Sequence, residues 1–511
     1  MGYLLGIDIG TSSTKTVLFD IRGEVVTSAL DVYPMYQPKN GWAEQDPDDW
    51  WSATVTSVKE VMAKSKISPK EIHGIGLSGQ MHGLVMLGED NKPLRSSIIW
   101  CDQRTAVECE QITSLVGDEK LIEITANPAI TGFTASKIMW VKNNEPDIYR
   151  KCKKILLPKD YIRYKLTGEF ATEVSDASGM QLLDVPKRQW SDYVLQKLDI
   201  DKSLLAKVYE SPEVTGTVTS EAAALCSLCE GIPVVGGAGD QAASAIGNGI
   251  VKKGVVSATI GTSGVVFAHL DEISIDAKGR VHTFCHAVPN TWHIMGVTQS
   301  AGLSYKWFRD NFMIAEKFTA EQLDANPNGI IDKISATSPP GANGIIYLPY
   351  LMGERTPHLN PNARGVFFGL SAMHTKNDLL RAVMEGVVFS LYDCLNIIKE
   401  MGTLPNCIFA GGGGANSPLW RQMMADTFDI DVAVNTSTES GALGVAILAG
   451  VGAGIYKDVV SACDSIIRMQ DSQSPIDNNK QLYSEMYNIF TSLYSSLKKD
   501  FVNLSKVTQI N

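Results

Sequence analysis

Long hydrophobic runs are scarce in this sequence. The longest stretch rich in Gly, Ala and other apolar residues, 441–456, is short for a membrane-spanning helix and follows closely on the charged residue Glu439. Near the N-terminus, no basic region precedes a long apolar segment, because Asp8 interrupts the apolar segment that could serve as one. A signal peptide is therefore not expected. We therefore expect a cytoplasmic protein in which 441–456 forms a helix packed closely on a sheet.

Paired cysteines and clusters of basic residues are also scarce. Nine cysteines are scattered along 511 residues, and the C-x-x-C pair of Cys226 and Cys229 has no second pair to complete a zinc site. Free thiols in a reducing compartment are therefore expected. A net charge of −11 without a run of Lys and Arg argues against a nucleic-acid binder, so an anionic substrate would need local positive groups.

A carboxylate interrupts the apolar segment 4–20, which reads LLGIDIGTSSTKTVLFD. The pattern predicts two strands joined by a Gly-Thr-Ser tip, with Asp8 near the end of the first strand. A P-loop would need G-x-x-x-x-G-K-[ST] and then a helix, whereas a second strand follows here, so the Walker motif is excluded.

The glycine turn of this hairpin could hold phosphate through its backbone N–H groups. The tip adds hydroxyl groups and an ammonium group, carried by Thr11, Ser12, Ser13 and Lys15. Asp8, beside the turn, would hold a hydrated Mg²⁺. The alternative is an ordinary hairpin whose Asp caps its own turn.

The same pattern recurs in the second half of the chain. Residues 254–270, GVVSATIGTSGVVFAHL, again predict a strand, an Ile-Gly-Thr-Ser turn and a strand. Two such hairpins fit two lobes that approach one nucleotide from opposite sides. We expect the junction near IGNGIVKKG, which divides the chain into 1–249 and 250–511. Strands alternating with long helices indicate an α/β protein.

A second carboxylate, Asp240, lies among glycines at the end of an apolar strand in PVVGGAGDQAASAIGNG, residues 233–249. It could accept the proton of an attacking hydroxyl, as an Asp does when a kinase phosphorylates an alcohol. The alternative is that Asp240 caps the helix beginning QAASAIG. Together with the two phosphate-type hairpins, the pattern favours the proton acceptor.

The turn GQMHG, residues 79–83, carries side chains suited to a sugar. Gln80 and His82 could hydrogen-bond hydroxyl groups, and Met81 could pack against the carbon chain. A purely structural histidine is the alternative. The histidines of HTFCHAVPNTWHIMGV are expected in a hairpin rather than at a metal, because no carboxylate completes a ligand set.

The glycine run 411–414, followed by Asn416, would offer an adenine ring a surface free of side chains. Pro418 follows within the first turn of a predicted helix, whose cap is expected to be Asn416 or Ser417.

Taken together, these motifs resemble the FGGY family of carbohydrate kinases, in the actin and hexokinase-like ATPase superfamily. The resemblance extends to about residue 455 and rests on GIDIGTSSTK, GAGDQ, TIGTSG and AGGGGANSPLW, with GFTASKIMWVKNN and GVFFGLSAMHTKNDLLRAVME as further signatures. It implies a two-lobed, ribonuclease H-like ATPase fold in which each lobe is a mixed sheet flanked by helices. ATP as co-substrate and Mg²⁺ are also implied. A homodimer is compatible with the resemblance, although no residue stripe marks an interface.

The resemblance also implies roles by position. Asp240 would be the proton acceptor, and Asp8 would be needed near the metal and phosphates. Met81 and His82 would touch the sugar, and Gln241 stands where family members acting on D-xylulose usually carry Asn. Five further residues would bind ATP. Gly261 and Thr262 would hold its phosphates, and the adenosine pocket would be lined by Gly412, Gly413 and Asn416.

Several stretches look most like the family members that act on D-xylulose, namely GWAEQDPDDWW, SGQMHG, LLPKDYIRYKLTGE and HTFCHAVPNTWHIMGVTQSAG. This implies in-line transfer of the ATP γ-phosphoryl group to O5 of D-xylulose, a pentulose sugar. Siblings acting on gluconate, ribulose or glycerol are one alternative. A non-catalytic, actin-like nucleotide-binding protein is another.

Overall fold

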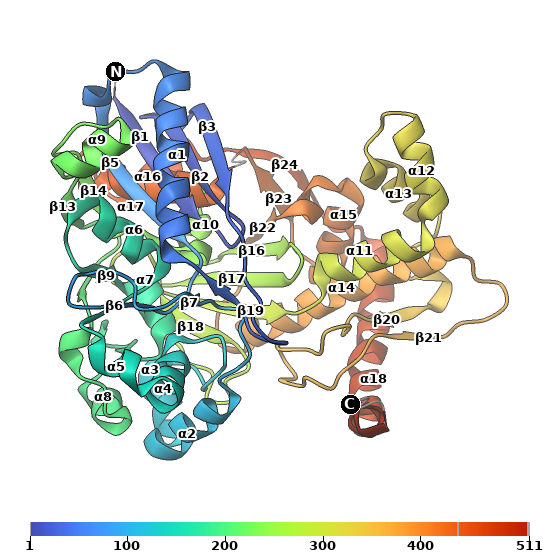
Figure 1. The fold of residues 1–511 in the computed structure, drawn as a ribbon. Helices are drawn as coiled ribbons and strands as arrows, with labels where there is room; N and C mark the ends of the chain where they lie inside the picture. The colour runs from blue at the N-terminus through green and yellow to red at the C-terminus, as the bar shows by residue number, and fades with distance from the viewer. Residues whose placement is uncertain (1, 437–438, 508–511) are drawn as a thin grey trace.

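The computed structural model describes residues 2–436 and 439–507. Two seven-stranded sheets, each flanked by helices, form two lobes (Figure 1). This confirms the predicted two-lobed α/β architecture. The strands of the first sheet are β1 (Tyr3–Ile9), β2 (Ser13–Asp20), β3 (Val25–Val32), β5 (Ile72–Gly79), β13 (Val214–Thr217), β14 (Pro233–Val235) and β15 (Ala238–Gly239). They are ordered β13-β14-β5-β1-β2-β3, and β15 also pairs with β5.

The second sheet repeats the arrangement of the first. Its strands are β16 (Val255–Ile260), β17 (Gly264–Leu270), β18 (His282–Cys285), β19 (Trp292–Thr298), β22 (Cys407–Gly411), β23 (Val432–Asn435) and β24 (Met469–Gln473). Their order is β18-β19-β17-β16-β22-β23-β24. In each sheet a hairpin, β1–β2 or β16–β17, is followed by a strand parallel to its first member, β5 or β22. Both predicted hairpins are therefore confirmed.

Helices cover the sheets on both lobes (Figure 1). Those around the first sheet are α1 (Pro47–Ser65), α6 (Pro158–Thr167), α9 (Ser220–Cys226), α10 (Asp240–Gly247), α16 (Ser440–Gly452) and α17 (Val459–Ile466). The lower part of the same lobe in the figure holds α2 (Ala106–Val116), α3 (Asp118–Thr125), α4 (Thr134–Asn144), α5 (Pro146–Lys151), α7 (Val174–Ala177) and α8 (Asp192–Leu198). The second lobe carries α11 (Ala301–Phe312), α12 (Ile314–Gln322), α13 (Pro327–Ser335), α14 (Lys376–Glu400), α15 (Pro418–Phe428) and α18 (Asp477–Val507).

Among the described residues, five two-stranded sheets accompany the two large ones. Their strands are β4 (Glu44–Gln45) with β7 (Ser97–Ile98), β6 (Val85–Leu87) with β8 (Lys154–Leu156), β9 (Ala171–Glu173) with β12 (Lys207–Tyr209), β10 (Leu183–Asp184) with β11 (Gln189–Trp190), and β20 (Ile346–Leu348) with β21 (Val366–Phe368). The sugar-type turn 79–83 lies between β5 and β6, as the sequence predicts.

Polar side chains cap the N-termini of helices α1 and α15. The Asp46 side chain accepts a hydrogen bond from Asp48 N at 3.0 Å, and Pro47 is the first residue of α1. Ser417 caps α15 by accepting from Trp420 N at 3.2 Å, which resolves the choice between Asn416 and Ser417.

Helix α16 lies on the first sheet, although its residues come from the second half of the chain. A Cβ on Gly76 of β5 would lie 1.9 Å from Val445 O, and one on Gly444 would lie 1.9 Å from Ala243 O of α10. Glycine is therefore required for this close approach of backbones. The predicted packing of 441–456 on a sheet is confirmed for the helical part. Within the described ranges, no helix combines the length and apolar character that crossing a bilayer requires.

Alternation along β1 decides which way Asp8 faces. Leu5, Ile7 and Ile9 belong to the apolar core shared with α1, whereas Leu4 belongs to the core shared with α16. Because successive strand residues point to opposite faces, Asp8 lies on the α16 side of the sheet. There it adjoins the first turns of α10 and α16 rather than the apolar α1 core.

Candidate active site

Asp8 lies near the end of β1 and is enclosed by residues from several segments. A Cβ on Gly441, at the start of α16, would lie 3.5 Å from Asp8 Oδ2. Burial raises the pKa of Asp8, and the nearby charge of Glu439 raises it further, against the lowering effects of Ser78 and Lys15. The adjoining turn is closed by its own backbone, since Gly10 N donates to Ser13 O at 3.0 Å. This geometry favours a functional carboxylate over one that caps its own turn.

The residues at the tip of this hairpin have partners from distant segments. Lys15 Nζ lies 2.6 Å from Glu439 Oε1. Trp100 Nε1 donates to Thr11 Oγ1 at 3.0 Å. Ser12 is exposed and Ser13 is half-buried. The tip is therefore held in place while its Ser12 hydroxyl remains open to a ligand.

Asp240 is the first residue of α10, and the N-cap position belongs to Gly239. The capping alternative is therefore wrong. Burial and the neighbouring charge of Asp8 raise the pKa of Asp240 to about 7, while hydrogen bonds from Gln241 oppose the shift. The structure thus brings Asp8 and Asp240, predicted from separate motifs, close enough to interact electrostatically.

The sugar-type turn packs against the segment that leads to Asp240. A Cβ on Gly239 would lie 2.9 Å from Met81 Cγ, so Met81 touches the residue that precedes Asp240. His82 Nδ1 donates to Gly179 O at 3.0 Å. Because a carbonyl oxygen only accepts, Nδ1 carries the hydrogen and Nε2 keeps a lone pair. Burial and the nearby Lys137 charge hold the pKa of His82 well below 6.5, so its ring is neutral.

Gln80 joins this turn to the phosphate-type hairpin. Its side chain is 1% exposed, and Nε2 donates to Gln45 Oε1 at 2.7 Å and to Gly10 O at 3.3 Å. The Gln80 amide nitrogen is therefore bonded to the hairpin, which couples the positions of the two turns.

Aromatic residues from both lobes surround His82. Its ring centroid lies 4.9 Å from that of Phe133 and 6.3 Å from that of Phe284 on β18. His282, on the same strand, donates from Nδ1 to Asn127 Oδ1 at 2.8 Å, and burial lowers its pKa to about 3. Strands β18 and β19 form the predicted hairpin, and Phe284 of this hairpin lies beside the sugar-type turn.

A cavity of about 460 Å³ lies in the second lobe, beside the β16–β17 turn. It is lined by four of the predicted ATP-binding residues, Gly261, Thr262, Gly413 and Asn416, and also by Tyr305 and Trp420. The turn is fixed to α11, because Gly302 N donates to Gly261 O at 2.8 Å and Leu303 N donates to Thr262 O at 3.0 Å. Gly412 lines an adjacent cavity of about 600 Å³, which Asn416 also borders.

Residues 3–247 match the N-terminal domain of the FGGY family of carbohydrate kinases, and residues 256–453 match its C-terminal domain. The chain belongs to this family. As an FGGY kinase it is an ATP-dependent carbohydrate kinase. The family resemblance and the two-lobed fold expected from the sequence are thus confirmed.

Relatives of this FGGY kinase match it over nearly its whole length. The xylulose kinase of Bacillus subtilis is 38% identical over 98% of each chain. The gluconokinase of Bacillus licheniformis is 34% identical, also over 98% of each chain. Among solved structures, the ligand-bound xylulose kinase of Lactobacillus acidophilus superimposes with a TM-score of 0.92 at 28% identity, covering 99% of this chain and 100% of the other.

Some neighbours of the FGGY kinase site were not singled out from the sequence. Phe133 and Phe284 lie in GFTASKIMWVKNN and HTFCHAVPNTWHIMGV, so these signature stretches contained a usable signal. No motif in the sequence pointed to Arg355. Its charge helps to lower the pKa of both His82 and His282, which places its guanidinium group near them.

Proposed function

We propose that this FGGY kinase transfers the γ-phosphoryl group of ATP to O5 of D-xylulose by in-line displacement. The observation that carries the proposal is the Asp240 carboxylate, which is close enough to Asp8 to feel its charge and directly follows Gly239, the residue that Met81 contacts. Xylulose kinases are also among the relatives that match over nearly the full length. The products are D-xylulose 5-phosphate and ADP.

Asp240 acts as the general base in this proposal. As O5 attacks, its proton passes to the Asp240 carboxylate, a bond forms between O5 and the γ-phosphorus, and the bond from that phosphorus to the ADP oxygen breaks. A pKa of about 7 suits a general base, because about half of the carboxyl groups are ionised at neutral pH and the ionised form still binds a proton well. His82 Nε2 accepts from a sugar hydroxyl, and Met81 packs against the carbon chain.

The charges around Asp8 suit a hard divalent cation. Asp8 has a raised pKa and lies near both Glu439 and Asp240, so an ionised Asp8 needs compensating positive charge. Carboxylate oxygens are the ligands that Mg²⁺ prefers. When bound, Mg²⁺ would neutralise charge on the phosphates, and Asp8 would hold it through its water shell. Lys15 and the backbone of both hairpin turns bind the phosphates directly.

Gluconate is a second candidate acceptor. The observation in its favour is the guanidinium group of Arg355 near His82 and His282, because a cation there could bind a substrate carboxylate. The similarity to a gluconokinase points the same way.

An ADP-release assay with a panel of acceptors tests the proposal. Mg-ATP is supplied with D-xylulose, D-ribulose, L-ribulose, gluconate or glycerol, beside a control without acceptor. We expect the largest kcat/KM with D-xylulose and only weak ADP release in the control, because the site is completed when sugar closes the lobes. A larger kcat/KM with gluconate would replace the proposed substrate, and equal ADP release without acceptor would contradict sugar phosphorylation.

A further inference from the structure

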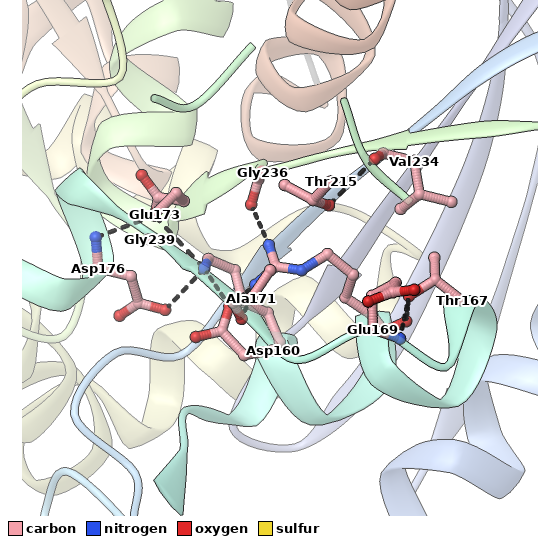
Figure 2. A network of polar contacts seen from close by, with 12 residues as sticks. Asp160, Thr167, Glu169, Ala171, Glu173, Asp176, Thr215, Val234, Gly236 and Gly239 are labelled. Carbon is pink, nitrogen blue, oxygen red and sulfur yellow. Dashed lines mark hydrogen bonds and ion pairs between the residues drawn. The ribbon is translucent and has the colours of Figure 1, made fainter. Parts of the chain in front are cut away.

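A cluster of buried charged side chains lies beside the segment 236–239, and Figure 2 shows its members Asp160, Glu173 and Asp176 with Gly236 and Gly239. The side chains of Lys159, Asp160, Arg163, Glu173 and Asp176 are all 0% exposed. Burying so many charges is costly unless each is paired and hydrogen-bonded. A cluster of this kind therefore calls for an explanation beyond fold stability.

Ion pairs join the members of this buried charged cluster. Lys159 Nζ lies 2.8 Å from Asp160 Oδ1, 3.3 Å from Glu173 Oε1 and 3.2 Å from Asp176 Oδ2. Arg163 Nη2 lies 2.6 Å from Asp160 Oδ1. The pairs cross from α6 to the end of β9 and to α7, so the cluster fixes these elements relative to one another (Figure 2).

Hydrogen bonds connect the cluster to both ends of the segment 236–239, directly at Gly236 and through Ser175 at Gly239. Arg163 Nη1 donates to Gly236 O at 2.7 Å. At the other end, Gly239 N donates to Ser175 Oγ at 3.1 Å, and Ser175 Oγ donates to Glu173 Oε1 at 2.9 Å. Gly239 directly precedes Asp240, so the Ser175 hydroxyl is one residue away from the proposed base.

The opposite side of the segment is closed by strand β5. Gly237 has a φ of +69°, and a Cβ there would lie 2.0 Å from Leu77 O. The segment is thus confined between β5 and the buried charged cluster. It has little room to shift without breaking one of the two cluster contacts.

We propose that the buried charged cluster positions the Asp240 carboxylate for proton transfer, and that Ser175 is the positioning residue that connects the two. The Ser175 hydroxyl both receives the Gly239 N–H and is oriented by Glu173, whose carboxylate also accepts from Ser175 N at 2.7 Å and Asp176 N at 2.9 Å. A general base is sensitive to placement, because a shift of about 1 Å can cost on the order of a hundredfold in rate. This inference rests on the proposed role of Asp240.

Ser175→Ala is the variant that tests it, and Ser211→Ala is the matched control. Ser211 is equally buried, and its Oγ donates to Glu173 Oε2 at 2.7 Å, so it loses a comparable bond to the same carboxylate. Its hydroxyl does not contact Gly239. Both variants are compared with the wild type for kcat, KM for sugar and ATP, and melting temperature.

We expect Ser175→Ala to lower kcat by about tenfold or more, with both KM values within about twofold. Ser211→Ala should lower the melting temperature to a similar degree with kcat little changed. Ser175→Thr, which keeps a hydroxyl group, should recover most of the lost kcat. A Ser175→Ala kcat equal to that of Ser211→Ala would overturn the inference.

A second background separates this inference from the proposed role of Asp240. In Asp240→Asn the base is gone, so adding Ser175→Ala should reduce kcat little further. A full additional loss in that background would show that Ser175 acts independently of Asp240, which also overturns the inference. If Asp240→Asn alone keeps the wild-type kcat, the proposed base is wrong, whatever Ser175→Ala does.

Discussion

The ammonium group of Lys15 lies 2.6 Å from Oε1 of Glu439, and this ion pair joins the phosphate-type hairpin to the residue before α16. The two side chains are 33% and 22% exposed, so the ammonium group is within reach of a ligand. The Lys15 ammonium group therefore lies near Asp8, is paired with Glu439 and can still donate hydrogen bonds to a ligand.

Replacing Lys15 by Met should raise the KM for ATP. A lost hydrogen bond to a charged phosphate is worth roughly 1.5–3 kcal/mol, or about tenfold to a hundredfold. Glu439→Gln keeps the ammonium group and should not raise this KM. Steady-state kinetics at saturating sugar measure the effect, with Lys64→Met as a control for an exposed lysine paired on α1. An unchanged KM in Lys15→Met would contradict phosphate binding by Lys15.

The raised pKa of Asp240 predicts how stability depends on pH. Its native pKa of about 7 exceeds the ordinary 3.8, so the native state binds more protons than the unfolded state between these values. This contribution makes stability fall as pH rises from about 4 to about 7, by roughly 4 kcal/mol at most. Asp240→Asn should therefore melt at a higher temperature than the wild type at pH 8, and the difference should shrink toward pH 5.

Thermal unfolding of both proteins at pH 5 and pH 8 measures this difference. Asp500→Asn, at an exposed helical position, is the control and should show no comparable dependence. A wild type that is as stable as Asp240→Asn at pH 8 would show that the carboxylate is not penalised by burial.

His82→Asn should weaken sugar binding. Asn tolerates the left-handed backbone that His82 adopts, with a φ of +69°, but it lacks an acceptor at the position of Nε2. Loss of one neutral hydrogen bond is worth about 1 kcal/mol, so we expect the sugar KM to rise about fivefold with kcat less affected. The half-buried His374, substituted by Ala, is the control. A raised KM for ATP with an unchanged KM for sugar would refute the assignment.

Gly413 offers a test of the adenosine pocket. A Cβ there would meet nothing within 4 Å, although the residue lines the cavity of about 460 Å³. Gly413→Leu should therefore fold normally and occupy space at the pocket wall, raising the KM for ATP by about tenfold or more. Gly413→Ala, which adds one methyl group, should change this KM less. Equal ATP kinetics in Gly413→Leu and the wild type would place the adenosine elsewhere.

Local patterns predicted the elements that local chemistry determines. The hairpin around Gly10, the cap of α15 and the glycine-rich α16 follow from strand alternation, capping and close packing, each readable within a short window. Asp8 and Asp240 were recognised because carboxylates are unexpected in apolar, glycine-rich strands.

Contacts between distant segments were not readable in the same way. The return of α16 to the first sheet, the bond from Gln80 to Gln45 and the link from Ser175 to Gly239 depend on how remote segments meet in space. The spacing of residues within one sequence does not predict which distant segments come into contact. The apolar and buried polar neighbours of the site therefore emerged only with the fold.

The most direct test of this account is the turnover of Asp240→Asn with D-xylulose and Mg-ATP, measured with sugar binding across a pH series. The account predicts a kcat at least about a hundredfold below the wild type, with sugar still bound, and a wild-type kcat that rises with pH through about 7 while the residual activity of the variant does not. A variant near the wild-type rate, or one with the same rise near pH 7, would contradict Asp240 as the base.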